Sequence, residues 1–190
     1  MNGIGHNQGP AMGPGTSWRR HCWTRARAEL IPHLPIEILR TRVRRAKELG
    51  LEYKTYASVR ASTGRDVIGF LFSSNALRAF DKSPKLPAAR VGKLNGLHAC
   101  ARIALVSAPL SPGRLIAANP DCGLPAMPAP AFTDNWPQTR AKVQAALRPG
   151  KLPADGILLI GDTTLEREWS EAGRLAGYLP AARYFDAAAP

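Results

Sequence analysis

Three short apolar runs, separated by stretches with helical spacing, constrain the fold of this chain more than any other feature. The runs cover residues 66–72, 102–106 and 156–160. Each is almost continuously apolar, which is typical of strands that are buried on both faces of a parallel sheet. Apolar residues with helical spacing lie between and after these runs, at residues 87–98, 135–147 and 165–176. We therefore predict a small α/β domain over residues 66–190, with a mainly parallel sheet between two layers of helices.

Two local signals refine this prediction. Thr163 and Glu166 have the spacing of a capping box, in which each side chain binds the backbone of the other residue at the start of a helix. They favour a helix directly after the third apolar run. The segment 119–131 contains four prolines and is predicted to be a loop.

Polar residues follow each of the three predicted strands. The candidate ligand-binding residues are Ser73, Ser74, Asn75, Ser107, Asp162 and Thr163. Because the carboxyl ends of parallel strands meet at one edge of a sheet, these side chains would converge and could bind a phosphorylated or nucleotide ligand. The same residue types are also the usual caps of helices that follow strands, and this alternative stays open.

Residues 18–65 are predicted to form a basic helical region before the sheet. A first helix would run to about Leu30 and place Trp23 between Arg19 and Arg27, where the indole either stacks on a base or packs inward. Two further helices, at 36–49 and 53–62, would be joined at Gly50, with the spacing of a helix-turn-helix. Any antiparallel pair of helices joined at a glycine would have the same spacing.

The net charge of +12 is concentrated in the first part of the chain. Residues 1–114 carry 19 basic and 6 acidic side chains, whereas residues 115–190 carry 7 and 8. A one-sided positive charge is typical of a protein that contacts phosphates. The candidate nucleic-acid-binding residues are Arg19, Arg20, Trp23, Arg27, Arg40, Arg44, Arg45, Lys47, Lys54 and Arg60.

The first 17 residues are rich in glycine and proline, and we expect them to form a flexible tail. Residues 4–10, Ile-Gly-His-Asn-Gln-Gly-Pro, resemble a short N-terminal segment of assorted bacterial and phage-associated proteins. That resemblance carries no known chemistry. It implies a bacterial setting and a docking function for the tail.

Several classes of protein lack support in the sequence. It contains no P-loop, no dinucleotide-binding glycine motif, no nucleophile elbow and no zinc-binding spacing, so we expect no cofactor or metal and identify no catalytic residue. Three widely spaced cysteines do not suggest a disulfide framework. There is no signal peptide and no apolar run of about 18 residues, so a cytoplasmic location and no membrane partner are expected.

We therefore predict a basic protein that binds nucleic acid, with DNA favoured over RNA, through its N-terminal helices. Two alternatives stay open. One is a small α/β enzyme or binding protein that uses a phosphorylated or nucleotide ligand at the strand ends. The other is an accessory subunit of a larger assembly, in which the tail docks onto a protein partner.

Overall fold

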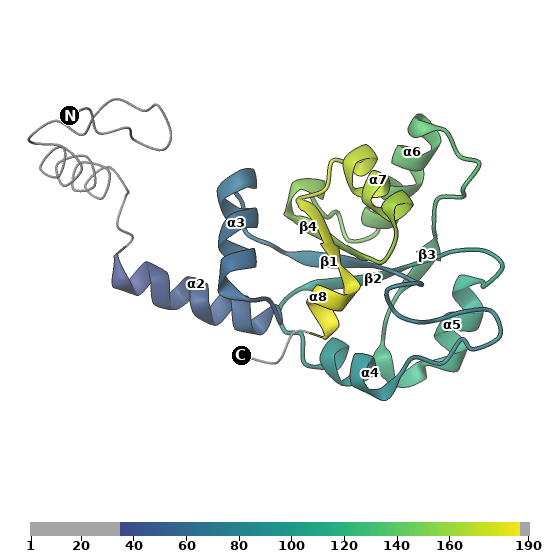
Figure 1. Ribbon diagram of the computed structural model, residues 1–190, viewed down its shortest axis with the longest axis horizontal. Coiled ribbons are helices and arrows are strands. Elements are labelled where there is room, and N and C mark those ends of the chain that lie inside the picture. Colours follow the sequence, from purple (N-terminus) through teal and green to yellow (C-terminus); the bar gives the residue numbers. More distant parts are fainter. Residues whose placement is uncertain (1–34, 187–190) are drawn as a thin grey trace, which may run out of the picture. The chain divides into compact units, whose positions relative to one another are not determined.

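The computed structural model describes residues 35–186 (Figure 1). The expected tail and the helix expected to end near Leu30 therefore lie outside the described residues. The chain divides into two compact units, residues 1–39 and 40–190. Of the first unit, only the start of one helix is described, and all that follows concerns the second.

The second unit contains a sheet of five strands, all parallel, in the order β3-β2-β1-β4-β5. The strands are β1 (Gly69–Ser73), β2 (Ala101–Val106), β3 (Ala126–Pro128), β4 (Ile157–Gly161) and β5 (Gly177–Pro180). In the register of the central strands, Phe72 lies opposite Ala104 on β2 and Ile160 on β4. The small α/β domain with a mainly parallel sheet is thereby confirmed.

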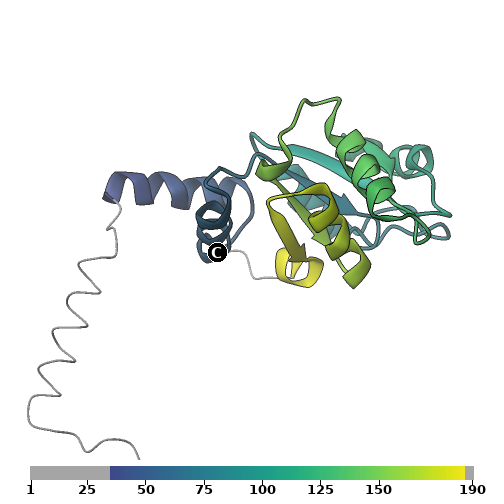
Figure 2. The same cartoon turned by 90° about the horizontal axis from the view of Figure 1, so that it is seen from above.

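Helices cover both faces of this sheet (Figure 2). The helices of the described residues are α2 (Ile36–Glu48), α3 (Tyr53–Thr63), α4 (Ala88–Asn95), α5 (Pro112–Ala118), α6 (Trp136–Leu147), α7 (Thr164–Gly173) and α8 (Ala181–Phe185), of which α2 does not lie over the sheet (Figure 2). Short 3-10 turns lie at Pro120–Cys122 and Ala154–Gly156. None of the helices within residues 35–186 is long and apolar enough to cross a membrane.

Alternate residues of the strands supply two separate cores, as the two-residue period of a strand requires. Phe70 and Phe72 belong to one core, together with Leu94 of α4. Leu71 belongs to the other core, together with Val143 of α6 and Trp169 of α7. Helices α4 and α7 therefore cover opposite faces of the sheet, which gives the three layers expected from the sequence.

The end of α2 and the start of α3 are part of the first core. Leu49, Leu51 and Tyr56 are all buried there. Gly50 between the helices has a positive φ of 60°, and its N–H donates to the carbonyl of Lys47 at 2.9 Å. Glycine adopts this conformation without strain, so the predicted helix–glycine–helix unit is confirmed.

Four elements were not expected from the sequence: β3, α5, β5 and α8. The prediction of a loop over residues 119–131 is wrong at residues 126–128, which form β3. A proline such as Pro128 is tolerated in β3, because β3 lies at the edge of the sheet. The last predicted helix is also too long. It ends at Gly173, Arg174 takes a left-handed conformation with φ 55°, and the chain turns into β5.

Candidate functional site

The strand order makes the carboxyl ends of β1 and β4 a topological switch point of the sheet. The chain leaves β1 toward α4 on one face of the sheet and leaves β4 toward α7 on the other face. Neighbouring parallel strands whose connections leave on opposite faces open a crevice beyond their carboxyl ends, where ligands of such sheets bind. We call this place the β1/β4 switch point. Figure 1 shows β1 and β4 in the middle of the sheet.

The two serines at the end of β1 hold the backbone together. Ser73 is fully buried, and its Oγ accepts a hydrogen bond from the N–H of Ala76 at 3.0 Å. Ser74 is 2% exposed, and its Oγ accepts from the N–H of Ser107 at 3.2 Å. The structure therefore brings Ser74 and Ser107 together, as the sequence suggested. The Ser73 oxygen therefore stabilises the turn after β1, and the Ser74 oxygen binds the residue that follows β2.

Glu166 of α7 joins the residues at the β1/β4 switch point. Its side chain is buried, with the residue only 1% exposed. One carboxylate oxygen accepts from the N–H groups of Asp162 at 2.5 Å and Thr163 at 3.0 Å, and the other accepts from the Asn75 side chain at 2.9 Å. Thr163 Oγ1 in turn accepts from the N–H of Glu166 at 3.2 Å, so the predicted capping box is confirmed. A carboxylate of the protein itself thus occupies the place where an anion would bind the start of α7.

Asp162 forms an ion pair with a residue of the turn that follows β1. Its Oδ2 lies 2.9 Å from Nη1 of that residue, Arg78. The side chain of Asp162 is 21% exposed and that of Arg78 is 50% exposed, so this ion pair is partly exposed to solvent. Sequence reasoning missed Arg78, although it comes three residues after Asn75.

The N-terminal helices contain two arginines that bind within the protein. Arg45 donates from Nε to Asp66 at 3.3 Å, from Nη1 to Glu48 at 3.1 Å, and from Nη2 to the carbonyls of Val67 and Ala99 at 3.1 Å each. Its side chain is 16% exposed. The donors of this residue are therefore used to join α2 to the segments that lead into β1 and β2.

Arg60 belongs to the same cluster around Asp66. Its Nη1 lies 3.8 Å from Oδ1 of Asp66, which also accepts from the hydroxyl of Tyr56 at 2.7 Å. Burial, followed by the hydrogen bond to Asp66, raises the pKa of Tyr56, so the tyrosine stays a neutral donor.

Three other candidate cations point into solvent. Arg44 and Lys47 on α2 and Lys54 on α3 are exposed, and within residues 35–186 none of them forms an ion pair. Arg40 is exposed as well but has an interaction within the chain. The remaining candidates, Arg19, Arg20, Trp23 and Arg27, lie outside the described residues.

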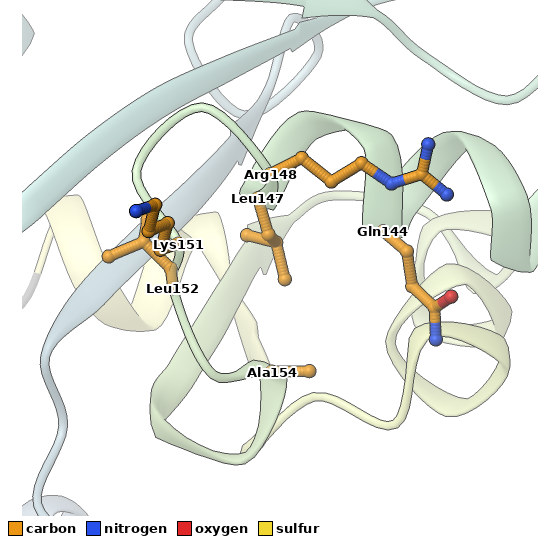
Figure 3. A pocket seen from close by; sticks show the side chains of 6 residues that line it. All are labelled: Gln144, Leu147, Arg148, Lys151, Leu152 and Ala154. Atoms are coloured by element: carbon orange, nitrogen blue, oxygen red, sulfur yellow. The ribbon is translucent and has the colours of Figure 1, made fainter.

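Two open pockets lie away from these features. One, of about 400 Å³, lies beside the end of α6, with Leu147, Leu152 and Ala154 around the hollow (Figure 3). The guanidinium of Arg148 extends away from that hollow (Figure 3). The other, of about 610 Å³, lies between α4 and the 3-10 turn at Pro120–Cys122. Neither pocket includes a candidate residue from the sequence.

Comparisons with protein-family models, curated proteins and solved structures find no match to this chain. Its chemistry must therefore be argued from its own residues. In the part of the chain that the structure describes, no group of three or more His, Cys, Asp or Glu side chains could hold a metal ion.

Gly161, the last residue of β4, offers a test of how tightly the β1/β4 switch point is packed. A Cβ atom at this position would lie 2.7 Å from Cε2 of Tyr178 and 2.8 Å from Oε2 of Glu166. We expect Gly161→Ala to lower the free energy of unfolding by about 1–3 kcal/mol, because the added methyl group must displace one of these side chains. Urea denaturation followed by circular dichroism measures the change.

Gly92 of α4 is the matched control for this substitution. A Cβ atom at Gly92 would meet nothing within 4 Å. Since alanine favours a helix over glycine, Gly92→Ala should raise the stability by about 0.5–1 kcal/mol. Equal midpoints for the two variants would contradict the packing described around Gly161.

Proposed function

We propose that this protein binds nucleic acid, with duplex DNA as the favoured form, through a cationic surface on α2 and α3. We call Arg44, Lys47 and Lys54 the α2–α3 cations. The observation that carries the proposal is that these three side chains are exposed and form no ion pair within residues 35–186. Binding to phosphates would pair these charges.

Two nearby acidic residues support this proposal, because they are already bound to other arginines. Glu48 and Asp66 both accept from Arg45, and Asp66 also lies near Arg60. Neither of these two carboxylates forms an ion pair with an α2–α3 cation. Arg44 and Lys47 are three residues apart on one helix and so lie close together, where like charges repel until an anion binds.

A further cation extends this surface from the other end of the chain. Nη2 of Arg183 on α8 donates to Oγ1 of Thr55 on α3 at 3.0 Å, so α8 adds positive charge beside the start of α3. The turn at Gly50 fixes α3 against α2, which leaves Lys54 and Ser58 exposed on the surface of α3. This arrangement suits a helix pair that contacts a phosphate backbone.

The test is the affinity for a fluorescent duplex oligonucleotide, measured by anisotropy as the salt concentration is raised. For the full chain we expect binding at about 50 mM salt and a linear fall of the logarithm of affinity with the logarithm of salt. Replacing all three α2–α3 cations by glutamine should weaken binding at least about tenfold. It should also reduce the slope of the salt dependence by about 2–3, since each phosphate contact contributes about 0.9.

The matched control removes the same charge elsewhere. Lys82, Lys85 and Arg148 are exposed and form no ion pair within residues 35–186, so a Lys82→Gln/Lys85→Gln/Arg148→Gln variant loses three charges as well. It should retain most of the affinity and the slope. Equal losses in the two variants, or no binding by the unchanged protein at about 50 mM salt, would overturn the proposal.

A further inference from the structure

The open pocket between α4 and the 3-10 turn at Pro120–Cys122 has the size and the lining of a small-molecule site. Its volume is about 610 Å³. Sites of this kind have volumes of about 300–1,000 Å³, mostly apolar walls and a few polar groups that orient the ligand. Among the residues that line this pocket, Leu86 and Cys122 are buried, whereas Lys85 and Asp121 are exposed. The pocket therefore has an apolar floor and a charged rim, and we call it the α4 pocket.

The walls of the α4 pocket are joined to one another by the side chain of Asn119. Its Oδ1 accepts from the N–H of Leu86 at 2.8 Å, and its Nδ2 donates to the carbonyls of Pro84 at 2.9 Å and Leu115 at 2.8 Å. The N–H of Cys122 donates to the carbonyl of Asn119 at 3.2 Å. One residue thus connects the segment before α4, the end of α5 and the 3-10 turn. A pocket that is held in shape in this way costs little ordering when a ligand binds.

The floor of the α4 pocket is neutral and is left open by a glycine. Leu86 is 4% exposed and Val91 is half-buried. Burial, followed by the charge of Asp121, raises the pKa of Cys122, so this thiol stays neutral and acts as a small apolar group. A Cβ atom at Gly92 would meet nothing within 4 Å. The floor can therefore accept an apolar group of a ligand.

The two charged residues at the rim have opposite signs and no partner among the described residues. Within residues 35–186, neither Lys85 nor Asp121 forms an ion pair, with the other or with a third residue. A ligand with a single charge would bind one of them and be repelled by the other. A ligand that carries both a carboxylate and an ammonium group would pair both charges. Each exposed pair contributes modestly, so contact with the apolar floor must add to the affinity.

We propose that the α4 pocket binds a small zwitterion with an apolar body, which is the chemistry of an apolar amino acid or a dipeptide. The ammonium group of Lys85 donates to the carboxylate of the ligand. The ammonium group of the ligand donates to the carboxylate of Asp121. The apolar body of the ligand lies on the floor formed by Leu86, Val91 and Cys122.

The test uses leucine and leucyl-leucine as probes of the ¹⁵N-labelled full chain. We expect the amide signals of Val91, Gly92 and Cys122 to shift in a saturable way with at least one probe, and the tighter probe distinguishes an amino-acid site from a dipeptide site. The N-acetyl form of that probe lacks the ammonium group, and its amide form lacks the carboxylate. Each form should bind about two- to fivefold more weakly, as the loss of one exposed ion pair requires.

Two variants assign the charges of the ligand to the rim. Lys85→Gln should bind the tighter probe and its amide form equally well, and it should still prefer that probe to the N-acetyl form. Asp121→Asn should show the reverse. Both residues are exposed, so both variants should fold normally. Lys82→Gln and Glu168→Gln, changed at exposed residues outside the pocket, should keep both preferences.

A third variant fills the α4 pocket without removing a contact. Gly92→Leu should fold, because leucine favours a helix over glycine and the position has free space. Its urea midpoint checks this, and its amide signals should no longer respond to either probe. The proposal would be overturned by the absence of a saturable shift with both probes, by equal binding of the capped and uncapped forms to the unchanged protein, or by undiminished binding to folded Gly92→Leu.

This proposal and the proposed nucleic-acid binding fail independently, because no α2–α3 cation lines the α4 pocket. The variant that lacks the α2–α3 cations should bind the probes as the unchanged protein does. Gly92→Leu should bind duplex DNA as before. A probe response that disappears with the α2–α3 cations would place it outside the α4 pocket and overturn the assignment.

Discussion

Replacing Glu166 by alanine should lower the free energy of unfolding by about 3–4 kcal/mol. The buried carboxylate accepts from the N–H groups of Asp162 and Thr163 and from the Asn75 side chain. Alanine would leave all three donors without this acceptor in a place where the residue is 1% exposed. Each unsatisfied buried donor costs about 1–3 kcal/mol, and partial entry of water offsets part of the total.

The measurement is the urea midpoint, supported by hydrogen exchange of the amides of Asp162 and Thr163. Glu168→Ala is the control, since Glu168 is an exposed glutamate on the same helix, and its change should be within about 0.5 kcal/mol. Glu166→Gln keeps the shape and one acceptor oxygen, so it should fall between the two. Equal midpoints for Glu166→Ala and Glu168→Ala would contradict the role assigned to this carboxylate.

The central part of the fold could be predicted from the sequence because burial on both faces leaves a clear mark. The runs that became β1, β2 and β4 are apolar at nearly every position, since those strands have neighbours on both sides and helices on both faces. The edge strands β3 and β5 are three and four residues long and only partly buried. Their residues therefore lack the continuous apolar pattern that identifies a strand.

The location of the candidate site could be predicted from the sequence. The contacts between its residues could be predicted less well. The polar residues after β1, β2 and β4 do meet at one edge, because the sheet is parallel. The hydrogen bond between Asn75 and Glu166 joins residues that are 91 apart in the sequence. No local pattern indicates that a glutamate of a helix cap will also bind a residue that follows a neighbouring strand.

Arg44 and Arg45 are neighbours in the sequence with opposite environments, and this contrast yields the second large effect. Arg45→Ala should lower the free energy of unfolding by about 2–3 kcal/mol. It removes hydrogen bonds to Asp66, to Glu48 and to the carbonyls of Val67 and Ala99 from a side chain that is 16% exposed. One hydrogen bond to a charged group contributes about 1.5–3 kcal/mol, and the partial exposure of Asp66 and Glu48 keeps the total for the four bonds close to the value for one.

Arg44→Ala is the matched control, because Arg44 is exposed and forms no ion pair within residues 35–186. It should change stability by no more than about 0.5 kcal/mol. If the proposed cationic surface binds nucleic acid, the order reverses in the binding assay: Arg44→Ala weakens binding, whereas folded Arg45→Ala protein, assayed well below its unfolding midpoint, binds nearly as before. One arginine then joins α2 to the segments that lead into β1 and β2, and this leaves the charge of its neighbour available for a phosphate. A loss of stability in Arg44→Ala equal to that in Arg45→Ala would show that both arginines serve the fold, and it would remove Arg44 from the proposed surface.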